Sequence, residues 1–134
     1  MSRSSDERSF YRKKFFLSLI IPGFFTLVMW MVWISEVLLD TDLSFLGIYP
    51  LTLKGMPGIL LSPFVHADIT HLYNNTVPFL LLATGLFYFY SEVALQVFSL
   101  TWIITGLLVW FAGREAWHVG ASGLVYGIAS FLFF

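Results

Sequence analysis

Four long apolar runs, separated by short polar segments, dominate the hydrophobic pattern of this chain. They cover residues 15–39, 69–90, 93–112 and 119–134. A helix needs about 20 apolar residues to cross a bilayer core about 30 Å thick, and the first three runs reach that length. Only Glu36 and the Pro22-Gly23 pair interrupt the first run, and membrane helices tolerate such a pair. The pattern therefore predicts an all-α, polytopic bundle of membrane helices.

The composition supports a membrane protein and excludes several other classes. Hydrophobic residues make up 58% of the 134 residues and charged residues 11%, against roughly 45–50% and about 25% in soluble domains. So small a domain leaves about a third of its chain surface exposed, so it could not bury this much apolar surface in water. A soluble globule, a disordered chain and a basic nucleic-acid binder are excluded. The absence of cysteine excludes a disulfide framework, a thiolate metal site and a cysteine nucleophile.

The distribution of positive charge predicts the orientation of the chain. Before the first apolar run lie five of the seven basic residues, namely Arg3, Arg8, Arg12, Lys13 and Lys14. Because basic residues stay on the cytoplasmic side, residues 1–14 are predicted to be cytoplasmic. Residues 40–68 and 113–118 then form outer loops, and the turn at 91–92 lies inside.

Three polar residues stand out because they fall at the same predicted depth, near the outer surface. His71 and Asn75 are four residues apart at the start of the second run, which places them on one helix face. Ser122 lies in the segment Gly120-Ala-Ser-Gly123, at the start of the fourth run. Each has a plainer interpretation. The serine can bond its own helix, the glycines can let helices pack closely, and the His-Asn pair can cap a helix or line a transport path.

Together these residues suggest a serine nucleophile with an oxyanion-binding site. A serine at a helix N-terminus lies beside free backbone N–H groups and the positive end of the helix dipole. With Asn and His side chains, these donors would stabilise the oxyanion of a tetrahedral intermediate. The flanking glycines would let an extended substrate approach closely.

These motifs resemble those of the rhomboid intramembrane serine proteases. His71-Leu-Tyr-Asn-Asn75 is similar to the family's His-x-x-x-Asn motif, and Gly120-Ala-Ser-Gly123 is similar to its Gly-x-Ser-Gly motif. Tyr126 matches a tyrosine that packs against the catalytic histidine, and His66 matches a frequent extra histidine. The resemblance runs from the first apolar run to Phe134, and the overall style of the sequence resembles that of bacterial members.

The resemblance implies a role for each matched residue. Ser122 would be the nucleophile, and Asn75, His71 and the Ser122 backbone N–H would form the oxyanion hole. Gly120, Gly123 and Tyr126 would shape the oxyanion and substrate site. The implied partners are transmembrane protein substrates and the lipid bilayer, without nucleic acid, metal or organic cofactor. The implied location is the bacterial plasma membrane.

Two features depart from the family pattern. Many rhomboids carry a Trp-Arg pair in the first outer loop, and residues 40–68 contain none. The family also has six core helices and places its general base, a histidine, on the sixth, whereas only four runs are present here. His118 is the histidine nearest in sequence to Ser122, but an interfacial or loop-ordering role suits it better than that of the base. We therefore expect the chain to be the N-terminal two-thirds of a rhomboid-like membrane domain.

Other functions remain open at this stage. A catalytically inactive rhomboid-like protein that binds transmembrane helices would share the fold, although the intact Ser122, His71 and Asn75 argue against it. A transporter fragment would be expected to carry more ionisable residues at mid-membrane depth. A zinc protease would need the second histidine and the glutamate of His-Glu-x-x-His, which His71 to Asn75 lacks.

We predict that the 134-residue chain alone does not cleave protein, whereas the complete protein does. An unactivated serine hydroxyl is a poor nucleophile, and the expected base lies beyond Phe134. The measurement is incubation of the detergent-solubilised chain with a transmembrane substrate. Cleavage that disappears in the Ser122→Ala variant would contradict the prediction.

Overall fold

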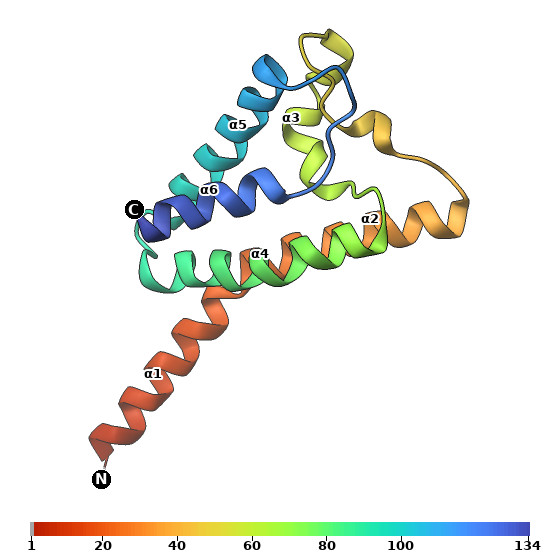
Figure 1. The fold of residues 1–134 in the computed structure, drawn as a ribbon. Coiled ribbons are helices and arrows are strands. Elements are labelled where there is room, and N and C mark those ends of the chain that lie inside the picture. The colour runs from red at the N-terminus through yellow and green to blue at the C-terminus, as the bar shows by residue number, and fades with distance from the viewer. Residues whose placement is uncertain (1) are drawn as a thin grey trace.

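The computed structural model describes residues 2–134, with side chains from residue 6 onward. Five longer helices carry the fold: α1 (Ser2–Ser18), α2 (Ile20–Leu39), α4 (Ile69–Phe89), α5 (Ala94–Ala112) and α6 (Ser122–Phe133). Between α2 and α4 lie η1 (Ser44–Leu46), η2 (Leu53–Gly55), α3 (Gly58–Leu61) and η3 (Ser62–Phe64). The described residues contain no β-strand, so the predicted all-α fold is confirmed (Figure 1).

The first apolar run is divided between two helices, and proline explains the break. Pro22 has no N–H, and its ring clashes with the carbonyl four residues earlier, which here belongs to Ser18. Helix α1 ends at Ser18, and α2 begins at Ile20. The N-terminal end of helix α1 projects away from the bundle, and α2 lies beside α4 (Figure 1). The other end of α1 contacts α4, where Lys14 Nζ lies 5.0 Å from the ring centroid of Tyr88.

Two stretches in the described residues are long and apolar enough to cross a membrane, Asp6–Leu39 and Ala94–Ala112. Helix α4 has polar residues in its first turns, and α6 has only 12 residues. Helix α6 begins three residues after the start of the fourth apolar run, because Gly120 has a positive φ of 105° that no helix contains.

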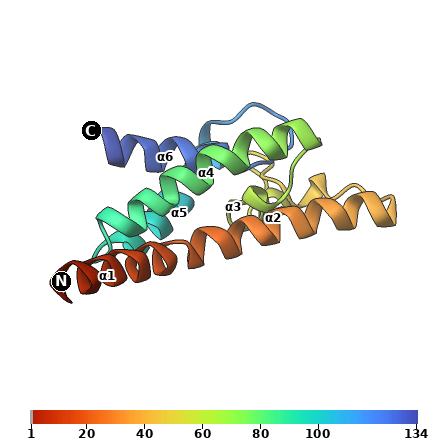
Figure 2. The same cartoon turned by 90° about the horizontal axis from the view of Figure 1, so that it is seen from below.

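Helix α4 lies between α2 and α6 and forms the centre of the bundle (Figure 2). Its fully buried residues include Leu72, Phe79 and Leu86. The ring of Phe25 on α2 packs against Phe79, with centroids 4.9 Å apart, and against Trp102 of α5 at 5.2 Å. Aromatic packing therefore joins three helices in one core.

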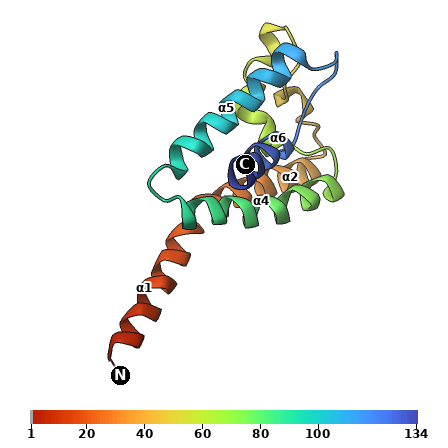
Figure 3. The same cartoon turned by 60° about the vertical axis from the view of Figure 1, so that its left-hand side comes forward.

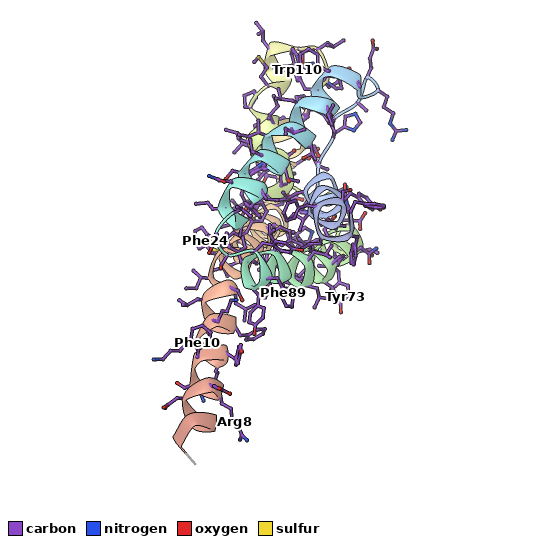
Figure 4. The ribbon with its side chains drawn as sticks, turned by 90° about the vertical axis from the view of Figure 1, so that its left-hand side faces the viewer. Arg8, Phe10, Phe24, Tyr73, Phe89 and Trp110 are labelled. Carbon is purple, nitrogen blue, oxygen red and sulfur yellow. The ribbon has the colours of Figure 1, made fainter. Side chains whose placement is uncertain are left out.

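Large apolar side chains also cover the outside of the bundle. Phe24 of α2 and Tyr73 and Phe89 of α4 are each more than half exposed, and Figure 4 labels them together with Phe10 of α1. Soluble monomers rarely expose contiguous apolar surface on this scale. The exposed apolar surface is that of a protein whose helices contact lipid.

The two segments that the sequence placed in outer loops are joined to each other. Ile48 and His118 exchange two backbone hydrogen bonds, of 2.9 and 2.8 Å. The indole N–H of Trp110 at the end of α5 donates to the carbonyl of Thr52 at 3.0 Å. The loop after α2 is thereby fastened to the segment that leads into α6.

Helices α5 and α6 approach closely through glycine, side by side in Figure 3. A Cβ added to Gly123 would lie 3.3 Å from the Cβ of Thr105, and one added to Gly127 would overlap the methyl group of Thr101. Small residues at such contacts let membrane helices gain van der Waals packing. The position of α6 therefore depends on these two glycines.

We predict that Gly127→Ala destabilises the bundle by about 1–3 kcal/mol, because the added methyl group meets the branched side chain of Thr101. Gly85→Ala is the matched control, since Gly85 is also helical and has no atom within 4 Å of an added Cβ. It should be neutral or stabilising by up to about 1 kcal/mol. Thermal unfolding in detergent measures both, and equal effects would contradict the packing argument.

Candidate functional site

The first turns of α4 hold His71 and Asn75 in fixed positions. Asp68 caps the helix, since its side-chain oxygen accepts a hydrogen bond of 2.8 Å from the backbone N–H of His71. One turn later, the Asn75 side-chain amide donates to the His71 carbonyl at 3.0 Å. Asn75 is buried and His71 is half-buried. Both side chains therefore lie on one face of α4, as their spacing predicts.

Gly120 brings the loop before α6 against these two side chains. A Cβ at this position would lie 2.6 Å from Cε1 and 2.7 Å from Nε2 of His71, and 3.6 Å from Nδ2 of Asn75. The positive φ of Gly120 also disfavours any residue with a side chain. The Gly120 N–H donates to the carbonyl of Ser62 at 2.9 Å, which fixes the loop from the other side.

Ser122 is the first residue of α6 and is half-buried. The N–H groups of a first helical turn lack intrahelical acceptors and carry partial positive charge. Ser122 lines a cavity of about 110 Å³ together with Ser62, His118 and Gly120. No hydrogen bond within the described residues joins its hydroxyl to His71 or Asn75. The structure thus places Ser122 two residues from the Gly120 contact, at a small cavity lined by both apolar and polar residues.

The other two sequence-predicted residues lie apart from this contact. Gly123 faces Thr105 of α5, so in this structure its contact serves helix packing. Tyr126 is one turn beyond Ser122 and is 73% exposed, so its ring lies outside the packed core of the described residues.

His66 is a buried histidine whose ring packs against the ring of His71. The two rings meet edge to face with centroids 5.1 Å apart, and His66 is only 3% exposed. Burial and the neighbouring His71 lower the pKa of His66 to about 4, so its ring is neutral at pH 7. In the sequence, His66 was only an extra histidine five positions before His71. Its ring contact with His71 could not be predicted, because spacing along the chain does not show which rings pack together.

His118 orders the loop that leads into α6. Its backbone pairs with Ile48, and its Nε2 lies 3.0 Å from the carbonyl oxygen of Arg114. These contacts match the loop-ordering role expected from the sequence, and the ring also lines the cavity of Ser122.

The fold and the site together define a helical membrane protein with a serine at a helix N-terminus beside a His-Asn pair. The family model described as "Rhomboid domain" matches residues 54–134, which include both motifs. The chain therefore belongs to the rhomboid family.

Mycobacterial proteins are among its relatives, and they are uncharacterized. One from Mycobacterium tuberculosis is 33% identical over 119 residues, which cover 81% of this chain and 48% of the relative. One from Mycobacterium leprae is 30% identical over 114 residues, which cover 81% of this chain and 45% of the relative. The chain thus spans about half the length of these relatives. No solved structure matches it significantly.

We predict that His66 makes stability depend on pH. Above pH 6.5 its ring is neutral in both the folded and the unfolded chain; between 6.5 and about 4 only the unfolded chain binds the proton. Stability should therefore fall by about 3 kcal/mol as pH decreases through this window. Unfolding temperatures in detergent from pH 7.5 to 4, compared with those of His66→Asn, measure the effect. The variant should be less stable at pH 7.5 and show a flatter pH dependence; parallel curves would contradict the prediction.

Proposed function

We propose that this chain carries the nucleophile and the oxyanion-binding part of an intramembrane serine endopeptidase. The observation that carries the proposal is the close contact of Gly120 with His71 and Asn75, two residues before a serine at a helix N-terminus. Membership of the rhomboid family supports it, since serine proteolysis is the usual activity that the family resemblance implies.

In the proposed reaction, the Ser122 hydroxyl oxygen attacks a peptide carbonyl carbon of the substrate. The negative charge that develops on the carbonyl oxygen is stabilised by three donors: the Asn75 amide, a His71 ring N–H and the Ser122 backbone N–H. Because donors held in place need no reorganisation during the reaction, losing one typically lowers the rate about 10²–10³-fold. The hydrogen bond from Asn75 to the His71 carbonyl holds the amide in place before substrate binds.

Serine requires a general base to accept its proton. The chain contains three histidines. His71 is proposed for the oxyanion hole, His66 is buried behind it, and His118 contacts Arg114. The family resemblance places the base on a sixth core helix, so we propose that the base lies outside these 134 residues.

The proposed substrates are transmembrane helices, which must open locally before a carbonyl can be attacked. The proposed arrangement is multi-pass, in a bacterial plasma membrane, with the N-terminus in the cytoplasm and Ser122 near the outer surface. The basic residues before α2 support this orientation. The alternative is a family member that binds transmembrane helices without cutting them. The experiment below distinguishes this alternative from a protease.

We predict that Ser122→Ala abolishes cleavage of a transmembrane substrate by the complete protein in proteoliposomes. Asn75→Ala should lower kcat/KM about 10²–10³-fold, because one oxyanion donor is lost. Asn74→Ala is the matched control: Asn74 is the exposed neighbour on the same helix and should leave the rate within twofold.

Gel analysis of the substrate and unfolding temperatures of each variant provide the measurements. A folded wild-type protein that binds but does not cut the substrate would favour the non-catalytic alternative. Equal losses in Asn74→Ala and Asn75→Ala would contradict the proposed oxyanion hole.

A further inference from the structure

A cavity of about 590 Å³ lies between α1 and the end of α4, far from the proposed serine site. From His71 to Phe87 the helix rises about 24 Å, which is most of the thickness of a bilayer core. The last turns of α1 lie beside the end of α4 that leads into α5 (Figures 1 and 3). The cavity shares no lining residue with the cavity of Ser122. Its lining residues include Phe10, Lys13, Lys14, Leu17, Phe87 and Ser91.

Two ammonium groups give this cavity a positive charge. Lys13 is exposed and Lys14 is half-buried, and Lys14 Nζ lies 5.0 Å from the ring centroid of Tyr88. This cation–π contact holds the Lys14 ammonium group against α4. The exposed hydroxyl of Ser91 adds a hydrogen-bond donor from the turn after α4. Within the part of the chain that the structure describes, no aspartate or glutamate lines the cavity, so its chemistry suits an anion.

The acidic residues of the neighbouring segments lie outside the cavity. Asp6 and Glu7 are exposed on α1, and Glu92 is exposed in the turn between α4 and α5. Asp6 precedes Lys13 by seven residues, as Glu7 precedes Lys14, which corresponds to about 10 Å along a helix. That separation is about one Debye length at 0.1 M salt, so these carboxylates only weakly offset the attraction for an anion.

The walls of the cavity are apolar side chains. Phe10 and Leu17 are 62% and 66% exposed, and Phe87 is half-buried. Phe10, Lys14 and Leu17 follow one another at spacings of four and three residues, so they share one face of α1. A soluble anion such as inorganic phosphate gains nothing from apolar walls. A phospholipid carries a phosphate next to acyl chains, so both kinds of surface in the cavity have a matching part in the lipid.

We propose that this cavity binds an anionic phospholipid, with the phosphate at Lys13 and Lys14 and an acyl chain along Leu17 and Phe87. The predicted orientation places α1 at the cytoplasmic leaflet, whose anionic lipids attract basic residues next to membrane helices. A lipid bound there would join α1 to α4 on the side of the membrane opposite the proposed serine site. The inference concerns lipid binding only, so it can hold whether or not the protein is a protease.

The first experiment compares two lipids. Native mass spectrometry of the 134-residue chain in detergent measures the dissociation constants of phosphatidylglycerol and of phosphatidylcholine with the same acyl chains. We expect phosphatidylglycerol to bind at least about tenfold more tightly, because only this lipid brings a net negative charge to the two ammonium groups. Equal dissociation constants would overturn the proposal.

Variants test whether the lipid occupies this cavity. Replacing both lysines, by Lys13→Gln with Lys14→Gln, should weaken phosphatidylglycerol binding about 25-fold, about fivefold for each lysine. The matched control is Arg8→Gln with Arg12→Gln, which removes the same charge from exposed positions of α1 that do not line the cavity. It should weaken binding by less than about threefold, because charges outside the site are screened by salt. Equal losses in the two double variants would overturn the proposed site in favour of a diffuse attraction of charge.

Two further variants guard against effects on folding. Lys13→Arg with Lys14→Arg keeps both charges and should keep the dissociation constant within about twofold, since a guanidinium group also binds phosphate. Lys13→Gln alone, at an exposed position, should weaken binding about fivefold and keeps the test valid if the double glutamine variant fails to fold. An unchanged dissociation constant in Lys13→Gln would overturn the role of this lysine in the site.

A competition experiment separates the phospholipid from a soluble anion. Inorganic phosphate and glycerol phosphate are added at millimolar concentrations to the chain with bound phosphatidylglycerol, and sodium chloride of equal ionic strength serves as the reference. We expect neither compound to displace more lipid than sodium chloride does, because neither can contact the apolar walls. Greater displacement by either compound would overturn the assignment to a phospholipid in favour of a soluble phosphate ligand.

Discussion

The close approach of the Gly120 backbone to the His71 ring is the contact on which the site depends. Any side chain at this position would overlap the ring, and the positive φ of Gly120 would strain it as well. The contact holds the start of α6 against the start of α4, two helices whose residues are far apart in the sequence. Together with the core packing of Leu72 and Leu124, it sets the position of Ser122 relative to the His-Asn pair.

The surrounding structure keeps this contact in place from three directions. The carbonyl of Ser62 accepts the Gly120 N–H, the backbone of Ile48 pairs with His118, and the threonines of α5 receive the glycines of α6. A loop next to a membrane needs such partners, because an unpaired buried backbone group costs several kcal/mol, about the value of a lost hydrogen bond in an apolar medium. The loop after α2 therefore supports the site, although it contributes none of the proposed catalytic residues.

Much of the fold could be predicted because it follows from local patterns. The apolar runs indicated the helices, and the spacing of His71 and Asn75 put both on one face of α4, as the structure has them. The break at Leu19 was also encoded locally, by Pro22, but the sequence interpretation treated Pro22-Gly23 only as a tolerated interruption. The pairing of His66 with His71 could not be predicted, because it depends on how the loops fold back on the helices.

By itself, the sequence determined the class of protein, the helices and the residue types at the site, since hydrophobic length and helical periodicity are properties of neighbouring residues. Only the tertiary structure decided which of those residues meet. It brought Gly120 to His71 and Asn75, turned Gly123 toward α5 and left Tyr126 exposed. The physical reason is that contacts between distant segments depend on close packing and on the pairing of buried polar groups, which a linear pattern does not contain.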